Sequence, residues 1–435
     1  MQALLSYDQA PPLAAPLRFF LTAPVFGMLA GGLLLWSGAD AFASRWTPAA
    51  LAITHLVTVG FMLQIMLGAM LQILPVVAGA NMARPLRVAR IVHFLTSVGA
   101  LFLAAAFLSF SPFLFALAAA LLAAGVAIFV VVAGQSLWGM LSTSPTISGL
   151  KLSLVGLTVT VGLGVLLSFA LSGFLGDVAL PVLQLADVHL AWGFVAWGTI
   201  LLAAVAYVVV PMFQLTPAYP EWFGRGFAWS TLIGVGVWTV ADLSGWETAA
   251  TVLALAVVAA PVTFATITLV IQRRSKRARF DATQHYWRFA LCSALAACAV
   301  WLAGRHLPSF AEWQEWPLLC GALVLFGGFV SVIVGMLYKI VPFLVWLHLQ
   351  NAGQGRLMAP NMKAMISEKA MHRQLVAHLA SCALVLLAVF WPAYFVYPAG
   401  VVLVVANGGL LRNLLAAVKA YHVHQQQIAS LLSAV

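Results

Sequence analysis

Long apolar runs, separated only by short polar stretches, follow one another along almost the whole chain. Each run has about 20 residues or more, which lets a helix cross about 30 Å of hydrocarbon. The runs are continuous and do not alternate with polar residues, so they predict membrane helices and exclude a membrane barrel. The twelve predicted spans are residues 17–37, 49–77, 88–110, 112–134, 150–174, 186–213, 227–244, 249–271, 286–304, 317–347, 374–391 and 396–418.

Composition agrees with this pattern. Of the 435 residues, 63% are hydrophobic and only 7% are charged, so no water-soluble domain could bury the apolar surface. The first residues are polar and contain prolines, and the first apolar run has full length, so we expect no cleavable signal. The sequence therefore predicts an all-α polytopic membrane protein in which residues 1–435 form a single transmembrane domain.

A short pattern recurs three times. A basic residue opens one span, and a Gly-Phe pair and then a proline follow in the next span. The separation between the basic residue and the Phe is nearly the same in all three copies. This predicts repeat units at about 15–145, 146–284 and 285–420, arranged as three pseudo-symmetric four-helix arcs around an axis along the membrane normal. A chance match in a chain rich in Leu, Ala and Val is the alternative. The copies run from Arg18 through Gly60-Phe61 to Pro75, from Lys151 through Gly193-Phe194 to Pro211, and from Arg288 through Gly328-Phe329 to Pro342.

The charge distribution predicts the orientation. If the N-terminus is cytoplasmic, 18 of the 21 Lys and Arg residues fall on the cytoplasmic side, including the dense run at 273–279. This is the asymmetry of the positive-inside rule, with both termini cytoplasmic in a bacterial-type inner membrane. The net charge of +10 therefore reports topology, and we expect no nucleic-acid partner.

His55 and His189 are the first candidates for a functional site. Each lies a few residues inside the outer end of the second span of its unit, where a polar group is costly. The corresponding part of the third unit is Leu323–Leu325, so that copy has no histidine. Neutral imidazole is a common metal ligand, and haem iron takes axial histidines within an apolar pocket. The alternative is a structural histidine that bonds a neighbouring helix.

A second set of polar residues approaches the cytoplasmic side. His93, His348 and His378 could hold a second haem or a metal, or could anchor helix ends. Lys339 follows Tyr338 within the tenth span, and Tyr207 lies in the sixth. These three are candidates for a proton or anion site, although Lys339 could instead extend to the interface. The four cysteines form no CxxC motif, which removes motif support for disulfides, iron–sulfur clusters and covalent haem.

The architecture resembles the core subunit of the haem–copper oxidases and nitric oxide reductases. Residues 18–23 (RFFLTA), with His55, Gly60-Phe61 and Pro75, resemble more closely the NnrS family of that superfamily. That family consists of haem-containing, copper-associated membrane proteins linked to nitric oxide metabolism. The resemblance implies a haem b, a role in nitric oxide response or electron transfer, and weak support for copper.

The chain also departs from the oxidase pattern. Gly193 occupies the position four residues after His189, where those oxidases place tyrosine or a comparable ligand. The sequence has no His-His pair, and the outer half of the tenth span has no histidine. The three-histidine copper site and its oxygen chemistry are therefore not expected, and no catalytic residue can be assigned.

Two other functions remain open. A twelve-helix transporter without haem would use His55, His189 and Lys339 as proton or substrate sites. A non-catalytic partner of a respiratory complex would make its contacts within the membrane. The partners to consider are therefore the lipid bilayer, a quinol, nitric oxide and a respiratory complex.

Overall fold

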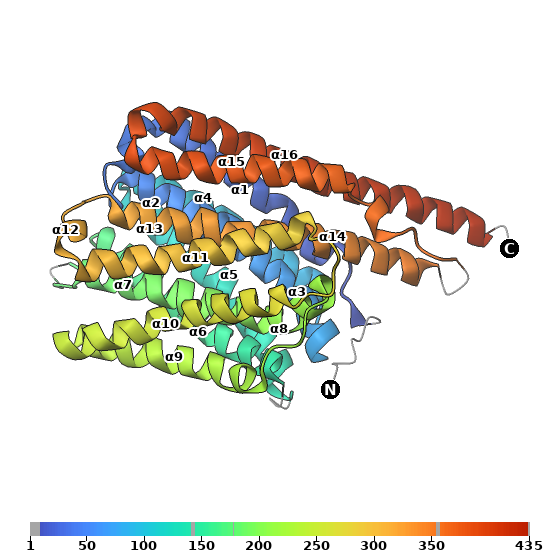
Figure 1. Cartoon of the computed structure of the whole chain (residues 1–435), viewed down its shortest axis with the longest axis horizontal. Coiled ribbons are helices and arrows are strands. Elements are labelled where there is room, and N and C mark those ends of the chain that lie inside the picture. The colour runs from blue at the N-terminus through green and yellow to red at the C-terminus, as the bar shows by residue number, and fades with distance from the viewer. Residues whose placement is uncertain (1–8, 141–143, 177, 354–356, 434–435) are drawn as a thin grey trace.

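The fold is a bundle of membrane helices (Figure 1). The structure, a computed structural model, describes residues 9–140, 144–176, 178–353 and 357–433. Every regular element within these ranges is helical, and twelve spans are long and apolar enough to cross a membrane. The all-α polytopic membrane fold is therefore confirmed.

Nine spans are single helices with or without a short extension, and three are built from an α-helix, a π-helix and a second α-helix. The elements are α1 (Ala14–Ser37), η2 (Gly38–Phe42), α2 (Pro48–His55), η3 (Leu56–Leu63), α3 (Gln64–Ala78), α4 (Pro85–Ser109), α5 (Pro112–Trp138), α6 (Pro145–Leu171), α7 (Val182–Ala191), η4 (Trp192–Thr199), α8 (Ile200–Gln214), α9 (Glu221–Leu243), α10 (Glu247–Arg273), α11 (Ala282–His306), α12 (Pro308–Ala311), α13 (Trp316–Ala322), η5 (Leu323–Val330), α14 (Ser331–Ala352), η6 (Met362–Ala364), α15 (Glu368–Phe390) and α16 (Pro392–Ser433).

Local sequence signals set several helix starts. Proline occupies the first helical position of α2, α4, α5 and α6, where a missing N–H costs nothing. The side chains of Thr47 and Ser111 cap α2 and α5 by accepting hydrogen bonds from the backbone N–H groups of Ala50 and Leu114.

The three composite spans lie at the centre of the bundle. Their most hydrophobic windows are 83%, 61% and 67% buried, against 22–50% for the other nine spans. The α1, α6 and α11 helices each pack along the composite span that follows them in sequence. The spans that carry His55, His189 and Lys339 are therefore enclosed by other helices.

The three π-helices recur with a constant spacing. The η3, η4 and η5 segments are each eight residues long. The proline of each composite span follows the first π-helical residue at the same separation: Leu56 to Pro75, Trp192 to Pro211, and Leu323 to Pro342. The spacing of the π-helices therefore has the same period as the sequence pattern.

Helix packing repeats with the same register. Each composite span has a small residue 12 positions after the first residue of its π-helix. In all three units this small residue contacts the preceding span at the same place, two residues before the basic residue of that span. Small side chains at these points let the helices approach closely. The facing pairs are Gly68 with Pro16, Ala204 with Gly149, and Gly335 with Tyr286.

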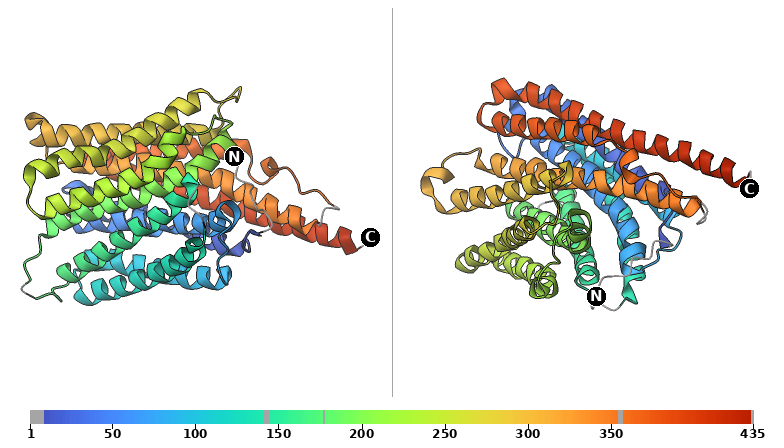
Figure 2. Two further views of the ribbon diagram at one scale, coloured as in Figure 1. Left: turned by 90° about the horizontal axis from the view of Figure 1, so that it is seen from below. Right: turned by 45° about the vertical axis from the view of Figure 1, so that its right-hand side comes forward.

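Both described chain ends lie at the same end of the bundle, which we call the terminal end; the other is the distal end (Figure 1). An even number of crossings requires this arrangement. The α16 helix continues past the rest of the bundle at the terminal end (Figure 2). The sequence predicted its span only to residue 418, because the hydrophobic pattern ends there while the helix continues to Ser433.

Candidate functional site

The structure brings His55 and His189 together. His55 is the last residue of α2, and His189 lies in α7, so they come from two different central spans. Their ring centroids are 6.5 Å apart and their planes differ by 21°. The sequence placed both at a similar depth, and the structure places them side by side.

The same nitrogen of each ring is held by the backbone. His55 Nδ1 is 2.8 Å from the Leu51 carbonyl oxygen, and His189 Nδ1 is 3.0 Å from the Thr160 carbonyl oxygen in α6. A carbonyl oxygen only accepts, so both Nδ1 atoms carry the hydrogen and donate it. Both Nε2 atoms therefore keep a free lone pair, which is the usual arrangement of a metal-binding histidine.

Apolar and small residues surround the pair. The Phe107 ring lies 4.8 Å from the His55 ring, and Phe115 meets Phe107 edge-on. A Cβ placed on Gly164 would lie 3.2 Å from His189 Cε1, so the glycine leaves the space that this ring needs. Both histidines are nevertheless only half-buried as whole residues.

An ion pair ties the two spans together close to this site. Arg45 Nη1 lies 2.9 Å from Asp187 Oδ1, two residues before His189, and the Arg45 guanidinium also covers the Trp46 ring at 4.4 Å. The side chains of Arg45 and Asp187 are 33% and 45% exposed, so solvent weakens their attraction. The pair links α7 to the loop before α2.

The π-helical register changes the expected equivalence of the histidines. His55 is one residue before its π-helix, whereas His189 is three residues before its own. The third-unit equivalents are therefore Ala322 and Cys320, and the expected Leu323–Leu325 lie inside η5. The Gly-Phe pairs on which the sequence alignment relied do not share one register.

Cys320 repeats the contact of His189 in the third unit. Its Sγ lies 3.6 Å from the Ala297 carbonyl oxygen, while His189 contacts that of Thr160. Thr160 and Ala297 are each nine residues after the basic residue that opens their span. The third unit therefore has a cysteine, Cys320, at the position that His189 occupies in the second unit.

The structure does not bring the second set of histidines together. His93 Nε2 bonds Thr22 Oγ1 at 2.7 Å, in the first unit. His348 contacts the carbonyl oxygens of Leu344 and Pro11, through Nδ1 at 2.9 Å and Nε2 at 3.1 Å. His378 is buried within α15, ten residues after the start of that helix. Each has its own protein partner.

The Lys339 side chain forms an ion pair. Its Nζ lies 2.7 Å from Asp281 Oδ2, and Arg277 Nη1 lies 3.0 Å from the same oxygen. Burial alone would raise the pKa of Asp281, but hydrogen bonds from Lys339, Thr283 and the Gln284 N–H together hold this pKa below its ordinary value. The sequence missed this partner because Asp281 is distant in the chain, at the residue that caps the start of α11.

The two tyrosines named with Lys339 have separate surroundings. The Tyr338 hydroxyl accepts a hydrogen bond of 2.8 Å from Asn413 Nδ2 in α16. Tyr207 packs edge-on against Tyr219 and Phe223, and its buried hydroxyl has no described partner. The three residues therefore do not form one described cluster.

Known proteins give no further information about this site. A scan against the known protein families and a search of curated proteins both found no match. The site therefore rests on its own geometry.

Proposed function

We propose that the protein binds one haem b through His55 and His189 and transfers electrons within the membrane. The observation that carries this proposal is the pair geometry. An imidazole nitrogen lies about 2 Å from a bound metal, so the ring centres of two imidazoles on opposite sides of one ion lie roughly 6 Å apart. The observed distance of 6.5 Å is close to this value. Both rings also have Nδ1 bonded to backbone and Nε2 free.

The number of protein ligands favours haem over a bare metal ion. Structural and catalytic zinc sites use three or four protein ligands. Within the described ranges, no three His, Cys, Asp or Glu residues lie close enough to hold a metal ion. A porphyrin provides its own four nitrogens, so two histidines complete the coordination. Phe107 and Gly164 provide apolar and open surface beside the rings.

The pairing of His55 with His189 also favours one of the two roles that the NnrS resemblance implies, which are nitric oxide response and electron transfer. When bound, haem supplies one-electron chemistry. His55 and His189 would hold the haem together, and the haem would supply electron transfer rather than nitric oxide binding, with a membrane quinol as a fitting donor. The transporter alternative relied partly on Lys339, which is held by Asp281.

We also propose that the terminal end faces the cytoplasm of a bacterial-type inner membrane. Of the 21 Lys and Arg residues, 18 fall in segments that the topology places at this end. Basic residues are retained on the cytoplasmic side of such membranes.

An optical spectrum of the purified protein tests the haem proposal. We expect a Soret band and sharp reduced bands of a six-coordinate b-type haem, with a pyridine haemochrome of about one haem per chain. His55→Gln and His189→Gln should each remove most of this absorption, because each removes an iron ligand.

His422→Gln is the matched control, since His422 lies on the exposed extension of α16. Its spectrum should equal that of the natural protein. Purified protein with no Soret band, or full haem content in both single variants, would overturn the proposal.

A further inference from the structure

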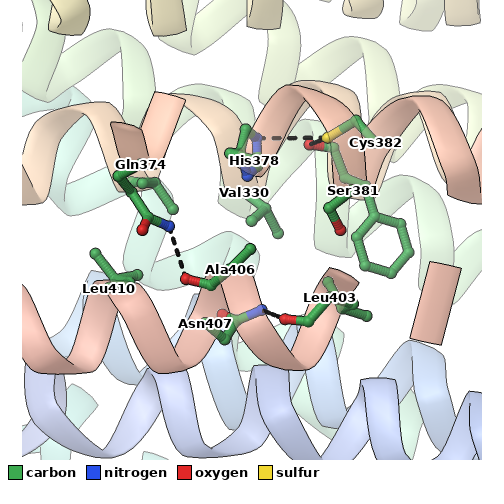
Figure 3. A pocket seen from close by; sticks show the side chains of 11 residues that line it. Val330, Gln374, His378, Ser381, Cys382, Leu403, Ala406, Asn407 and Leu410 are labelled. Carbon is green, nitrogen blue, oxygen red and sulfur yellow. Dashed lines mark hydrogen bonds between the residues drawn. The ribbon is translucent and has the colours of Figure 1, made fainter. Parts of the chain in front are cut away.

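A small cavity, lined mainly by apolar residues together with a few polar ones, lies among η5, α14, α15 and α16 (Figure 3). It has about 10 Å³ of free volume, which is about the space that one water molecule needs. His378, Ser381 and Asn407 are among the residues that line it. No Lys, Arg, Asp or Glu lines it.

The hydrogen bonds around His378 determine where its proton lies. Ser331 Oγ is 2.9 Å from the Phe326 carbonyl oxygen and 2.7 Å from His378 Nε2. The carbonyl only accepts, so the single Ser331 hydrogen is donated to it. Both bonds are satisfied only if His378 Nε2 carries a hydrogen and donates it to Ser331. His378 Nδ1 is then bare.

Cys382 is consistent with this assignment. Its Sγ lies 3.4 Å from the same Phe326 carbonyl oxygen and 3.5 Å from His378 Nε2. The thiol can donate to the carbonyl, and its sulfur can weakly accept from Nε2–H. The hydroxyl hydrogen of Ser331 and the thiol hydrogen of Cys382 are thus both directed to the Phe326 carbonyl oxygen. His378 Nδ1 has no hydrogen-bond partner among the described residues.

Ser381 provides an unpartnered group in the same cavity. Its side chain is 2% exposed, and its hydroxyl has no hydrogen-bond partner in the described part of the chain. In Figure 3 this hydroxyl points from α15 toward α16. An unsatisfied buried hydroxyl is costly, and a buried water typically bonds such groups. The amide nitrogens of Gln374 and Asn407 are already bonded to backbone carbonyls.

We propose that one internal water binds here between Ser381 and His378 Nδ1, and that His378 accepts a proton through it among the membrane-spanning helices. The water donates one hydrogen to Nδ1. When a hydronium forms at this position, its proton passes to Nδ1, and water and an imidazolium with hydrogen on both nitrogens remain. The proposal does not depend on haem.

The titratable groups that face His378 are few. On α11, the Tyr286 ring centroid lies 5.3 Å from the His378 ring centroid, and on α15 there is Cys382. The residues of η5, α14 and α16 that line the cavity have no titratable side chain. The buried Tyr286 hydroxyl has no partner among the described residues.

Solid-state NMR of ¹⁵N-histidine-labelled protein in nanodiscs tests the proposal. The His378 signals are assigned by Ser331→Ala, which removes the Nε2 partner, with Ser136→Ala as control because Ser136 Oγ bonds only its own helix. Above neutral pH we expect hydrogen on Nε2, bare Nδ1 and a cross-peak from Nδ1 to water. As the pH is lowered into the acid range, both nitrogens should become protonated.

A cavity-filling variant separates the water from the histidine itself. Ala406 lines the cavity on α16, and Ala406→Val should remove the water cross-peak and leave hydrogen on Nε2. If that variant does not fold, Ser381→Ala should weaken the cross-peak because the water loses a partner. Hydrogen on Nδ1 above neutral pH, no water cross-peak in the natural protein, or a His378 that stays singly protonated at every acidic pH at which the protein remains folded would each overturn the proposal.

Discussion

At the residue scale, the candidate site depends on partners that only the structure shows. The bond of His55 to Leu51 lies within one helical turn and is local in sequence. The bond of His189 to Thr160 joins α7 to α6, two helices separated by a loop. A single sequence has no signal for which carbonyl a ring nitrogen meets on another helix. It could therefore propose the two histidines but not their common orientation.

Gly164 offers a specific test of that orientation. A Cβ at this position would lie 3.2 Å from His189 Cε1, so Gly164→Val should displace the His189 ring. We expect haem affinity to fall roughly tenfold or more, as for other changes that disturb a ligand's orientation. Titration of the apoprotein with haem measures this.

Gly162→Val is the control for this change. Gly162 lies two residues earlier in α6, and a Cβ there would meet nothing within 4 Å. Its haem affinity should stay near that of the natural protein. Equal affinities in the two variants would show that the His189 position does not matter for binding.

The ion pair of Asp281 and Lys339 predicts a pH dependence of stability. The pKa of Asp281 is lowered in the folded protein, so its stabilising effect is present above the unfolded value of about 3.9. That effect is lost as pH falls through the lower folded pKa. Asp281→Asn should cost about 1–3 kcal/mol near neutral pH, because it leaves Lys339 without its charged partner.

Thermal unfolding in detergent at a series of pH values measures this effect. The difference between Asp281→Asn and the natural protein should narrow below about pH 4. Lys363→Gln is the control, since Lys363 and Glu368 are both largely exposed and solvent screens their pair. A constant difference at all pH values would contradict the assignment to Asp281 ionisation.

At the scale of elements, the sequence predicted the spans but not the π-helices within them. The composite spans are buried on most sides, so they have hydrophobic residues all around and show no helical period. A change from α-helical to π-helical geometry therefore does not alter any hydrophobic periodicity in the sequence, and the sequence could not predict it. Aligning Gly60 with Gly193 leaves His55 and His189 one residue out of register, whereas aligning the starts of the two π-helices leaves them two residues out of register.

The close packing of the inner spans gives a prediction at this scale. A Cβ on Gly335 would lie 2.6 Å from Tyr286 Cβ, so Gly335→Leu should force α11 and α14 apart. We expect a loss of about 1–3 kcal/mol or more in unfolding free energy, the usual cost of overpacking. Unfolding in mixed detergent measures it.

Gly321→Leu is the matched control, since a Cβ on Gly321 would meet nothing within 4 Å and the glycine lies in the same composite span. Its stability should change little. If Gly335→Leu were equally stable, the proposed close contact of the two helices would be wrong.

At the scale of the whole molecule, composition was sufficient for the fold class. Each of the twelve apolar runs corresponds to one span. The arrangement of those spans was less accessible, because lipid-facing and protein-facing helices have similar side chains. The enclosed position of the three composite spans comes from the structure.

The orientation of the whole molecule can be tested with reporter fusions. A green fluorescent protein fused after the C-terminus should fluoresce in a bacterial cell, and alkaline phosphatase fused there should be inactive, because the terminal end is cytoplasmic in our proposal. Phosphatase fused in the loop between α5 and α6 should also be inactive, whereas fusion between α4 and α5 should be active. The reverse pattern would contradict the proposed orientation.

The constant spacing of the π-helices also has a consequence for the history of the chain. A π-helix arises most simply when one residue is inserted into an existing α-helix. All three composite spans have their π-helix at the same separation from the proline, so three independent insertions would have had to occur at one position. A single insertion in an ancestral four-helix protein, before the gene segment was copied, explains the spacing with one event. The histidines have different positions relative to the π-helix in the first and second copies, so this single event does not account for them.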